Sequence, residues 1–156
     1  MIIRRATVND MDGINNLLLQ VLMVHHNGRP DLFKPNAKKY TDEELTDIIN
    51  DDKRPIFVAA DDSDKILGYA FCVHTKHIND NILTDIDTLY IDDICIDESS
   101  RGMHVGTKIY EYVKAYAKES GCYNITLNVW SCNPTAISFY ESLGLKPYKI
   151  GMEQLL

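Results

Sequence analysis

The stretch DTLYIDDICIDESSRGMHVGTKIYEYVKAYAKES, residues 87–120, places a strand-like run before a polar turn and an amphipathic helix. The turn carries Arg101, Gly102, His104 and Gly106. A strand, a glycine-containing loop and a helix in this order leave backbone N–H groups free at the helix N-terminus, where they can bind phosphate. We therefore expect a phosphate-bearing ligand beside residues 101–107.

Two common phosphate loops do not fit this turn. Gly102 and Gly106 have three residues between them, whereas a P-loop requires four before its Gly-Lys-Ser/Thr. The dinucleotide fingerprint G-x-G-x-x-G is also missing from the turn. The loop therefore belongs to another class.

Working outward from this stretch, hydrophobic periodicity and turn residues predict an α/β domain in the order β-α-α-β-β-β-α-β-α-β. The first helix is capped by Thr7 or Asn9, and its pattern fades at residue 25. Thr41 and Glu44 form a capping box for the second helix, and Gly144 ends the last one. The expected strands are residues 2–5, 55–61, 65–75, 83–97, 123–130 and 149–156, of which 55–61 and 65–75 form an antiparallel hairpin. The unit from about residue 86 to 130 supplies a parallel pair, and ligands of such sheets bind at the carboxyl ends of strands.

Composition limits the classes of partner that the chain is expected to bind. The chain has 156 residues, enough for one domain spanning 1–156, and a net charge of −7. An acidic chain argues against nucleic acid and is compatible with a cationic ligand. No apolar run approaches the roughly 20 residues that span a bilayer, and the N-terminus resembles no signal peptide, so we expect a cytoplasmic protein without membrane contact.

The four cysteines do not indicate a metal site. None forms C-x-x-C, so we expect no bound metal, and a cytoplasmic chain is not expected to form a disulfide. Cys132 is either a nucleophile or a small packed thiol, and the second reading is favoured because no His–Asn or His–Asp pair is placed to activate it.

Two motifs resemble those of one enzyme family. Arg101, Val105 and Gly106 match a pyrophosphate loop, [RQ]-x-x-G-x-[GA], with His104 in place of its central glycine. The later stretch NPTAISFYESLGLKP matches N-x-x-A-x-x-F-Y-x-x-x-G-[FL]. Together they resemble the GNAT superfamily of acetyl-CoA-dependent N-acetyltransferases. A dozen residues, LYIDDICIDESSRG, are also similar to the diamine (polyamine) acetyltransferases.

The resemblance implies a single-domain GNAT fold, with a mixed, mostly antiparallel sheet and helices on both faces, and acetyl-CoA as co-substrate. The pantetheine arm is expected on the main chain of Ile94 and Ile96, with an N–H near Cys95 polarising the thioester carbonyl. Asn133 is expected to contact the cofactor arm and to cap the last helix. Either the backbone at His104 is ordinary and its side chain points outward, or the geometry of this loop differs from that of the family; the first alternative is favoured. The expected pyrophosphate-binding residues are Arg101, Gly102, Met103, His104, Val105, Gly106 and Thr107, with Gly106 allowing close approach of the backbone.

Acetyl transfer to an alkyl amine requires a base and an acid. An ammonium of pKa near ~10 must lose a proton, which costs about 4 kcal/mol at neutral pH. Asp92 and Asp93 are the candidate bases, and neighbours on a regular strand face opposite ways, so one alone reaches the cleft unless a bulge intervenes. Asp92 is preferred by the polyamine-enzyme likeness. Tyr140 matches the family's general acid, although it can also be read as a helix tyrosine packed beside Phe139.

We therefore expect acetylation of a primary amine on a cationic small molecule such as a polyamine. The alternatives are a protein N-terminus or lysine as acceptor, or a non-catalytic acyl-CoA sensor. The loop from His25 to Tyr40 is expected to line the acceptor pocket without an assigned role for its side chains. A homodimer is expected, because two-fold dimers are the commonest assembly and the family often forms them.

Overall fold

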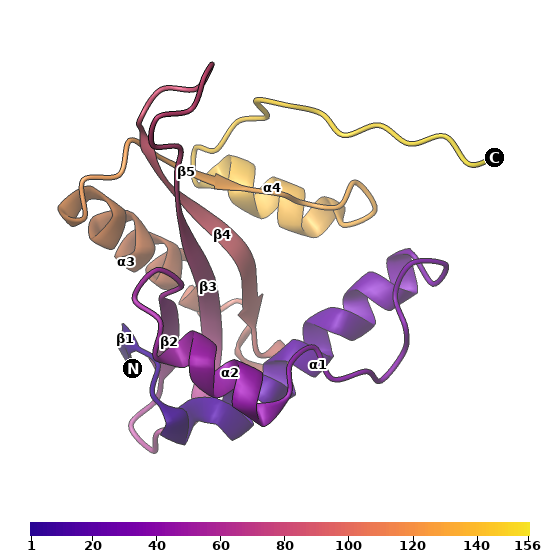
Figure 1. The fold of residues 1–156 in the computed structure, drawn as a ribbon. Helices are drawn as coiled ribbons and strands as arrows, with labels where there is room; N and C mark the ends of the chain where they lie inside the picture. The colour runs from indigo at the N-terminus through magenta and orange to yellow at the C-terminus, as the bar shows by residue number, and fades with distance from the viewer.

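The computed structural model describes all 156 residues as a five-stranded sheet with helices packed on both faces (Figure 1). The elements in chain order are β1 (Ile2–Arg5), a 3-10 turn (Val8–Asp10), α1 (Met11–Gly28), α2 (Asp42–Ile49), β2 (Ile56–Ala60), β3 (Ile66–Lys76), β4 (Asp87–Ile96), a second 3-10 turn (Glu98–Ser100), α3 (Val105–Glu119), β5 (Asn124–Leu127) and α4 (Pro134–Ser142).

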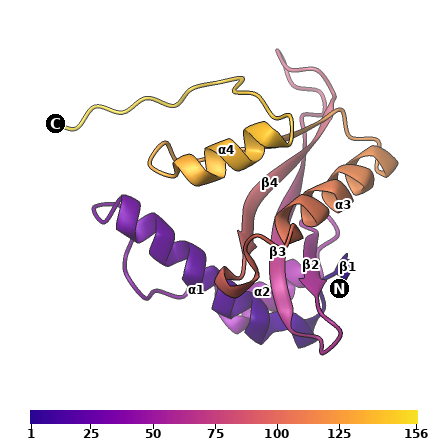
Figure 2. The same cartoon turned by 180° about the vertical axis from the view of Figure 1, so that it is seen from behind.

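The sheet order follows the chain, β1-β2-β3-β4-β5. All neighbours are antiparallel except β4 and β5, which run parallel. Helices α1 and α2 cover one face and α3 covers the other, as the two opposite views show (Figures 1 and 2). The expected mixed, mostly antiparallel α/β fold is confirmed.

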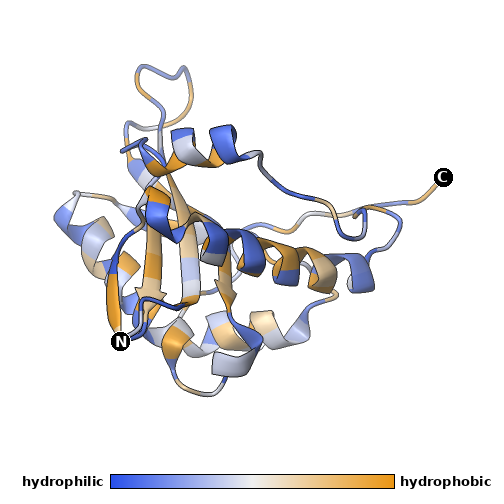
Figure 3. Cartoon of the chain, turned by 90° about the horizontal axis from the view of Figure 1, so that it is seen from below, coloured by the Kyte–Doolittle hydropathy of each residue, from blue (hydrophilic) through white to orange (hydrophobic).

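Two apolar clusters sandwich the sheet. Ile14, Leu17 and Leu45 of α1 and α2 pack on Tyr69 on one side. Ile109 of α3 packs on the other side, so β3 is buried on both faces. The strands are accordingly mostly apolar, whereas the helices alternate apolar and polar residues (Figure 3). Each fully buried Leu or Ile stabilises the fold by about 1.5–3 kcal/mol.

Local capping signals are confirmed. The Thr41 Oγ1 accepts from the Glu44 N–H at 3.1 Å while the Glu44 carboxylate accepts from the Thr41 N–H at 2.8 Å. Asn133 caps α4 by accepting from the Ala136 N–H at 3.2 Å. Thr7 precedes the 3-10 turn, and its N–H donates to the Asp10 carboxylate at 2.8 Å; α1 itself begins after Asp10, so neither Thr7 nor Asn9 is its N-cap residue.

The end of α1 was predicted too early. The helix continues through Gly28 instead of fading at His25. Two contacts hold the extra turn: the centroids of the tilted His25 and Phe33 rings lie 5.0 Å apart, and His26 Nδ1 lies 2.7 Å from the Phe33 carbonyl oxygen. These contacts come from the following loop, so the local sequence pattern does not contain them.

The predicted last strand is wrong. Residues 145–156 form no strand and extend away from the body of the molecule (Figures 1 and 2). A strand requires a neighbour, and the outer edge of β5 has none, so the apolar side chains of Tyr148, Ile150 and Met152 are exposed. An ion pair of 3.0 Å between Arg29 and Glu153 tethers this segment to the end of α1.

No helix is both long and apolar enough to cross a bilayer.

Candidate active site

A bulge in β4 opens the sheet. Phe71 of β3 pairs with Asp93 and Cys72 pairs with Ile91, so Asp92 is the extra residue on β4. Strand β5 pairs with β4 from Thr88 to Ile91 and not beyond. Residues 94–96 of β4 consequently have β3 on one side and no strand on the other.

The free edge belongs to Ile94 and Ile96. The Asp97 N–H donates to the Leu67 carbonyl at 2.9 Å. Because backbone groups alternate in direction along an antiparallel pair, Cys95 faces β3 as Asp97 does, and Ile94 and Ile96 face the open side. The Cys95 thiol is also buried, 7% exposed. The backbone N–H and C=O groups of Ile94 and Ile96 are therefore available for pairing at this edge. The N–H that is expected near Cys95 to polarise the thioester carbonyl would then belong to Ile94 or Ile96.

The bulge also brings both acids to one face. Lys39 Nζ lies 3.2 Å from Asp92 Oδ2 and 3.8 Å from Asp93 Oδ2. The Asp92 side chain is 38% exposed and the Asp93 side chain 10% exposed. Neighbouring residues of a regular strand face opposite ways, but the bulge at Asp92 lets the side chains of Asp92 and Asp93 reach the same side.

Burial governs the charges around Lys39. It raises the pKa of Asp93, and the Lys39 ammonium and the Tyr69 hydroxyl, which donates at 2.8 Å, offset this effect in part. Burial alone would lower the pKa of Lys39, but the carboxylates of Asp93 and Asp92 outweigh it and raise the pKa. Burial lowers the pKa of His25, which the nearby Asp93 counters in part. A neutral imidazole and a charged ammonium thus border the acid pair.

Tyr140 lies on α4 and its side chain is half-buried. Burial raises the pKa of its phenol, and the nearby Asp93 and Cys95 raise it further. The phenol therefore keeps its proton at neutral pH. Its ring lies 5.4 Å from that of Phe139, so Tyr140 also packs beside Phe139, as the alternative interpretation of this tyrosine predicts.

The opening between β4 and β5 is a cleft of about 1490 Å³. Predicted site residues that line it are Asp92, Asp93, Ile94, Asn133 and Tyr140. Cys95, Ile96 and residues 101–107 do not line it; the loop lies past the carboxyl end of β4, and Arg101 borders a separate shallow depression beside α1.

The start of α3 fits an anion. Its first backbone bond runs from the Lys108 N–H to the His104 carbonyl at 3.1 Å, which leaves the N–H groups of Val105, Gly106 and Thr107 without an acceptor in the helix. His104 has φ 58° and ψ 19°, the left-handed conformation that glycine adopts most easily. The expectation of an ordinary backbone at His104 is wrong, whereas its exposure is confirmed.

Packing explains Gly106. A Cβ at this position would lie 3.0 Å from Phe139 Cζ and 3.4 Å from Ile96 Cγ1. The missing side chain therefore lets α4 approach the first turn of α3, a reason different from the predicted close approach of a phosphate. Met103, by contrast, is 60% exposed beside this turn.

Sequence reasoning missed Lys39 and assigned no role to His25. Lys39 reaches Asp92 from 53 positions away, and no local motif surrounds it. His25 lines the cleft because α1 continues one turn further than its pattern predicts. The signal that could have pointed to Lys39 is the acid pair itself, because two carboxylates on one face require a counter-charge.

Comparison with known proteins identifies the family. The Acetyltransferase (GNAT) family profile matches residues 23–145. The chain belongs to this family, which uses acetyl-CoA as its acetyl donor. The GNAT fold expected from the two motifs is thereby confirmed.

The similar proteins differ in how much of this chain they match. A mutant of the BH1408 protein from Bacillus halodurans is 32% identical, covers 100% of this chain and 99% of its own, and superposes with a TM-score of 0.95. Glucosamine 6-phosphate N-acetyltransferase of Arabidopsis thaliana is 31% identical over 65 residues, which span 42% of either chain. Aminoglycoside N-acetyltransferase AAC(6')-Iy in complex with CoA, 15% identical over 99% of this chain and 98% of its own, shares the fold with a TM-score of 0.72.

Proposed function

We propose that the protein transfers the acetyl group of acetyl-CoA to a primary amine on a cationic small molecule, such as a polyamine. The observation that carries this proposal is the convergence of Asp92 and Asp93 on one ammonium, that of Lys39. A place that holds a lysine ammonium between two carboxylates has the charge that a protonated substrate amine requires.

The donor side uses the backbone. The N–H groups at the start of α3 bind the pyrophosphate, and the free edge of Ile94 and Ile96 pairs with the amides of the pantetheine arm. An N–H of the same edge donates to the thioester carbonyl as negative charge develops there. Asn133, which lines the cleft, contacts the arm and holds α4 in place.

Two proton transfers complete the reaction. Asp92, which solvent reaches, accepts the proton of the ammonium and passes it to water, so that the neutral amine can attack the acetyl carbonyl carbon. Asp93 stays buried and keeps the amine in position. The new C–N bond forms as the C–S bond breaks, and the Tyr140 hydroxyl donates its proton to the leaving thiolate. Bound acetyl-CoA supplies the activated acetyl thioester.

An amino sugar is the second candidate acceptor. It is favoured by the Arabidopsis relative, whose name specifies glucosamine 6-phosphate. A phosphorylated sugar requires a cation in the cleft. Arg29 there is paired with Asp31 at 2.7 Å and Glu153 at 3.0 Å, but Lys114, Lys118, Lys146 and Lys149 also line the cleft. We rank the sugar phosphate below an unphosphorylated cationic amine because the carboxylates of Asp92 and Asp93 favour a cation at the acceptor position.

The test measures thiol release from acetyl-CoA with spermidine, glucosamine 6-phosphate, an aminoglycoside and a lysine peptide. We expect the highest kcat/KM with one of the polycations. Preference for the peptide or the sugar phosphate would replace the proposed acceptor, and no turnover with any amine, with acetyl-CoA bound, would favour a sensor.

Lys39→Met provides the structural check on the same assay. Removing the internal ammonium vacates the place between the acids, so KM for the cationic amine should fall several-fold. Lys38→Met is the matched control, because Lys38 pairs with Asp42 and touches neither acid. A raised KM in Lys39→Met would mean that Lys39 organises the acids instead of standing where the substrate binds.

A further inference from the structure

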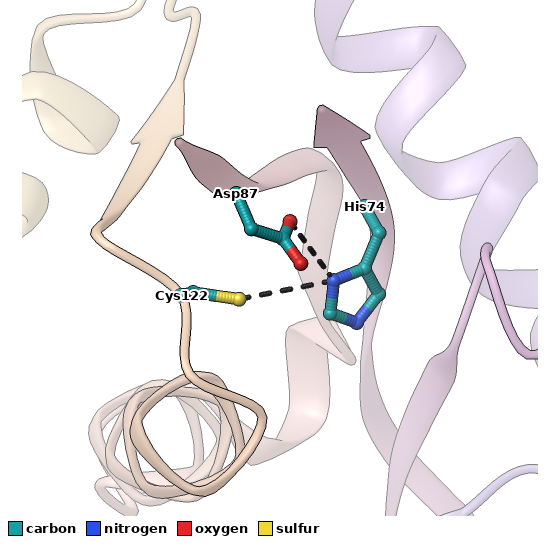
Figure 4. Close-up of side chains that lie close together, drawn as sticks. All are labelled: His74, Asp87 and Cys122. Atoms are coloured by element: carbon teal, nitrogen blue, oxygen red, sulfur yellow. Dashed lines mark hydrogen bonds and ion pairs between the residues drawn. The ribbon is translucent and has the colours of Figure 1, made fainter. Parts of the chain in front are cut away.

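A cluster of three potential metal ligands lies away from the proposed acetyl-transfer residues. His74 of β3, Asp87 at the start of β4 and Cys122 between α3 and β5 point toward one another (Figure 4). Asp87 precedes Asp92 on the same strand by five positions, about 17 Å at 3.3 Å per residue. The cluster has no part in the proposed reaction.

The spacing of the ligand atoms matches a tetrahedral ion. His74 Nδ1 lies 3.3 Å from Asp87 Oδ1 and 3.8 Å from Cys122 Sγ. All three atoms lie within 4.8 Å of one another. With metal–nitrogen and metal–oxygen bonds of ~2.0 Å and a metal–sulfur bond of ~2.3 Å, a tetrahedral site separates its ligands by roughly 3.3–3.6 Å. Small side-chain movements would therefore complete the coordination.

The imidazole is already oriented for ligation. His74 Nε2 lies 3.0 Å from the Tyr116 hydroxyl, which leaves Nδ1 toward the thiol and the carboxylate. Metal-bound histidines usually donate their second ring N–H to an oxygen acceptor, which fixes the ring, and the Tyr116 hydroxyl oxygen can accept that bond here. The Tyr123 N–H donates to the Asp87 carbonyl at 2.8 Å and so holds the Cys122 segment against β4.

The same arrangement argues against a nucleophilic cysteine. In a Cys–His–Asp triad the thiol and the carboxylate contact opposite nitrogens of the imidazole. Here both approach Nδ1, and Tyr116 occupies Nε2. A nitrogen that faces two acidic groups at once has the surroundings of a metal ligand.

We propose that His74 Nδ1, Asp87 Oδ1 and Cys122 Sγ bind one divalent transition-metal ion, with Zn²⁺ preferred. The mixed sulfur, nitrogen and oxygen set suits Zn²⁺, because thiolate and imidazole select against Mg²⁺ and Ca²⁺. Water supplies the fourth ligand, since Cys122 lines the end of the cleft. Binding releases the thiol proton to solvent as the metal–sulfur bond forms. The ion would join β3, β4 and the α3–β5 connection.

The test uses the tag-free full chain after treatment with a chelator. Co²⁺ titration should give thiolate charge-transfer absorption and the strong visible bands of tetrahedral cobalt, saturating at about one ion per chain, and Zn²⁺ should displace them. Cys122→Ser should abolish the charge-transfer band. Cys132→Ser is the matched control, because Cys132 is exposed and outside the cluster, and it should retain the band.

A stability measurement gives a second readout. Zn²⁺ should raise the unfolding temperature of the wild type and of Cys132→Ser with increasing concentration, and should leave Cys122→Ser and Asp87→Asn unchanged. Circular dichroism of the metal-free variants establishes that they are folded. Absence of the cobalt bands in the wild type, or a charge-transfer band that survives in Cys122→Ser, would overturn the site.

Discussion

At the scale of single residues, the site combines groups that motifs identify with groups that only folding brings together. Tyr140, Asp92 and Asp93 stand in recognisable sequence patterns, and all three line the cleft. Lys39 stands in no such pattern, because it joins the site through its contact with Asp92, which lies 53 positions away in the sequence. The position of these three candidate residues in one cleft was therefore predictable from sequence, whereas the internal ammonium of Lys39 was not.

Tyr140 and Asp92 are tested together. If Tyr140 protonates the leaving thiolate, Tyr140→Phe should lower kcat by about 10²-fold or more with little change in acetyl-CoA affinity, because the ring remains. Asp92→Asn should lower kcat/KM for the amine and move the pH–rate profile upward. The double variant should lose less than the product of the two effects, since both residues serve one sequence of proton transfers. Near wild-type turnover in Tyr140→Phe would remove the tyrosine from the mechanism.

Asp93 should reduce stability at neutral pH. Its pKa is higher in the folded chain than in the unfolded one, so the folded chain binds more protons between the two values. The free energy of unfolding therefore decreases as pH rises through that window and stays lower above it. Asp93→Asn, which cannot ionise, should unfold at a higher temperature than the wild type at about pH 7, with the difference vanishing at about pH 3. Asp92→Asn, at a more exposed position, is the control. A stability loss in Asp93→Asn at neutral pH would contradict this account.

At the scale of elements, local signals predicted what local interactions determine. The Thr41 capping box and the hairpin of β2 and β3 depend on neighbouring residues and form as expected. The end of α1 depends on a contact with Phe33 from the following loop. The predicted last strand would have to pair with the outer edge of β5, and no strand pairs there. His74, Asp87 and Cys122 likewise show no metal-site spacing along the chain, because three separate elements contribute them.

The turn into α3 contains a measurable backbone strain. An L-residue in the left-handed region costs about 1–2 kcal/mol, and histidine is among the better tolerated residues there. His104→Gly should therefore raise stability by up to about 1 kcal/mol, which is about 2–4 °C in unfolding temperature. Gly102→Ala is the reciprocal variant: φ is +80° and no atom lies within 4 Å of the added Cβ, so its expected loss reports backbone conformation alone. Thermal unfolding of both variants tests this prediction. Destabilisation by His104→Gly would contradict the backbone strain assigned to His104.

At the scale of the whole molecule, the chain leaves the apolar side chains of its C-terminal segment uncovered. Ile150 is 83% exposed and Met152 is 94% exposed, beyond a sheet whose β5 edge is free. We predict that this segment contributes to the interface of the expected homodimer; the homodimer and the cytoplasmic location both stay predictions.

Truncation tests the assembly without disturbing the core. We expect the full chain to sediment as a dimer at micromolar concentration and a chain ending at Lys146 to sediment as a monomer. The removed residues form no strand and are exposed, so circular dichroism should change little. A monomeric full chain would refute the dimer, and a dimeric truncated chain would place its interface elsewhere.

The free edge of β4 has a consequence for deuterium uptake. The amide hydrogens of Ile94 and Ile96 face away from β3, while that of Cys95, between them, faces it. In the free protein, exchange should thus be fast, slow and fast along three consecutive residues. Acetyl-CoA, if its arm pairs with this edge, should slow Ile94 and Ile96 selectively and leave Cys95 nearly unchanged. Residue-resolved exchange by NMR would read out cofactor docking without any acceptor amine, and uniform slowing of all three amides would indicate general stiffening instead.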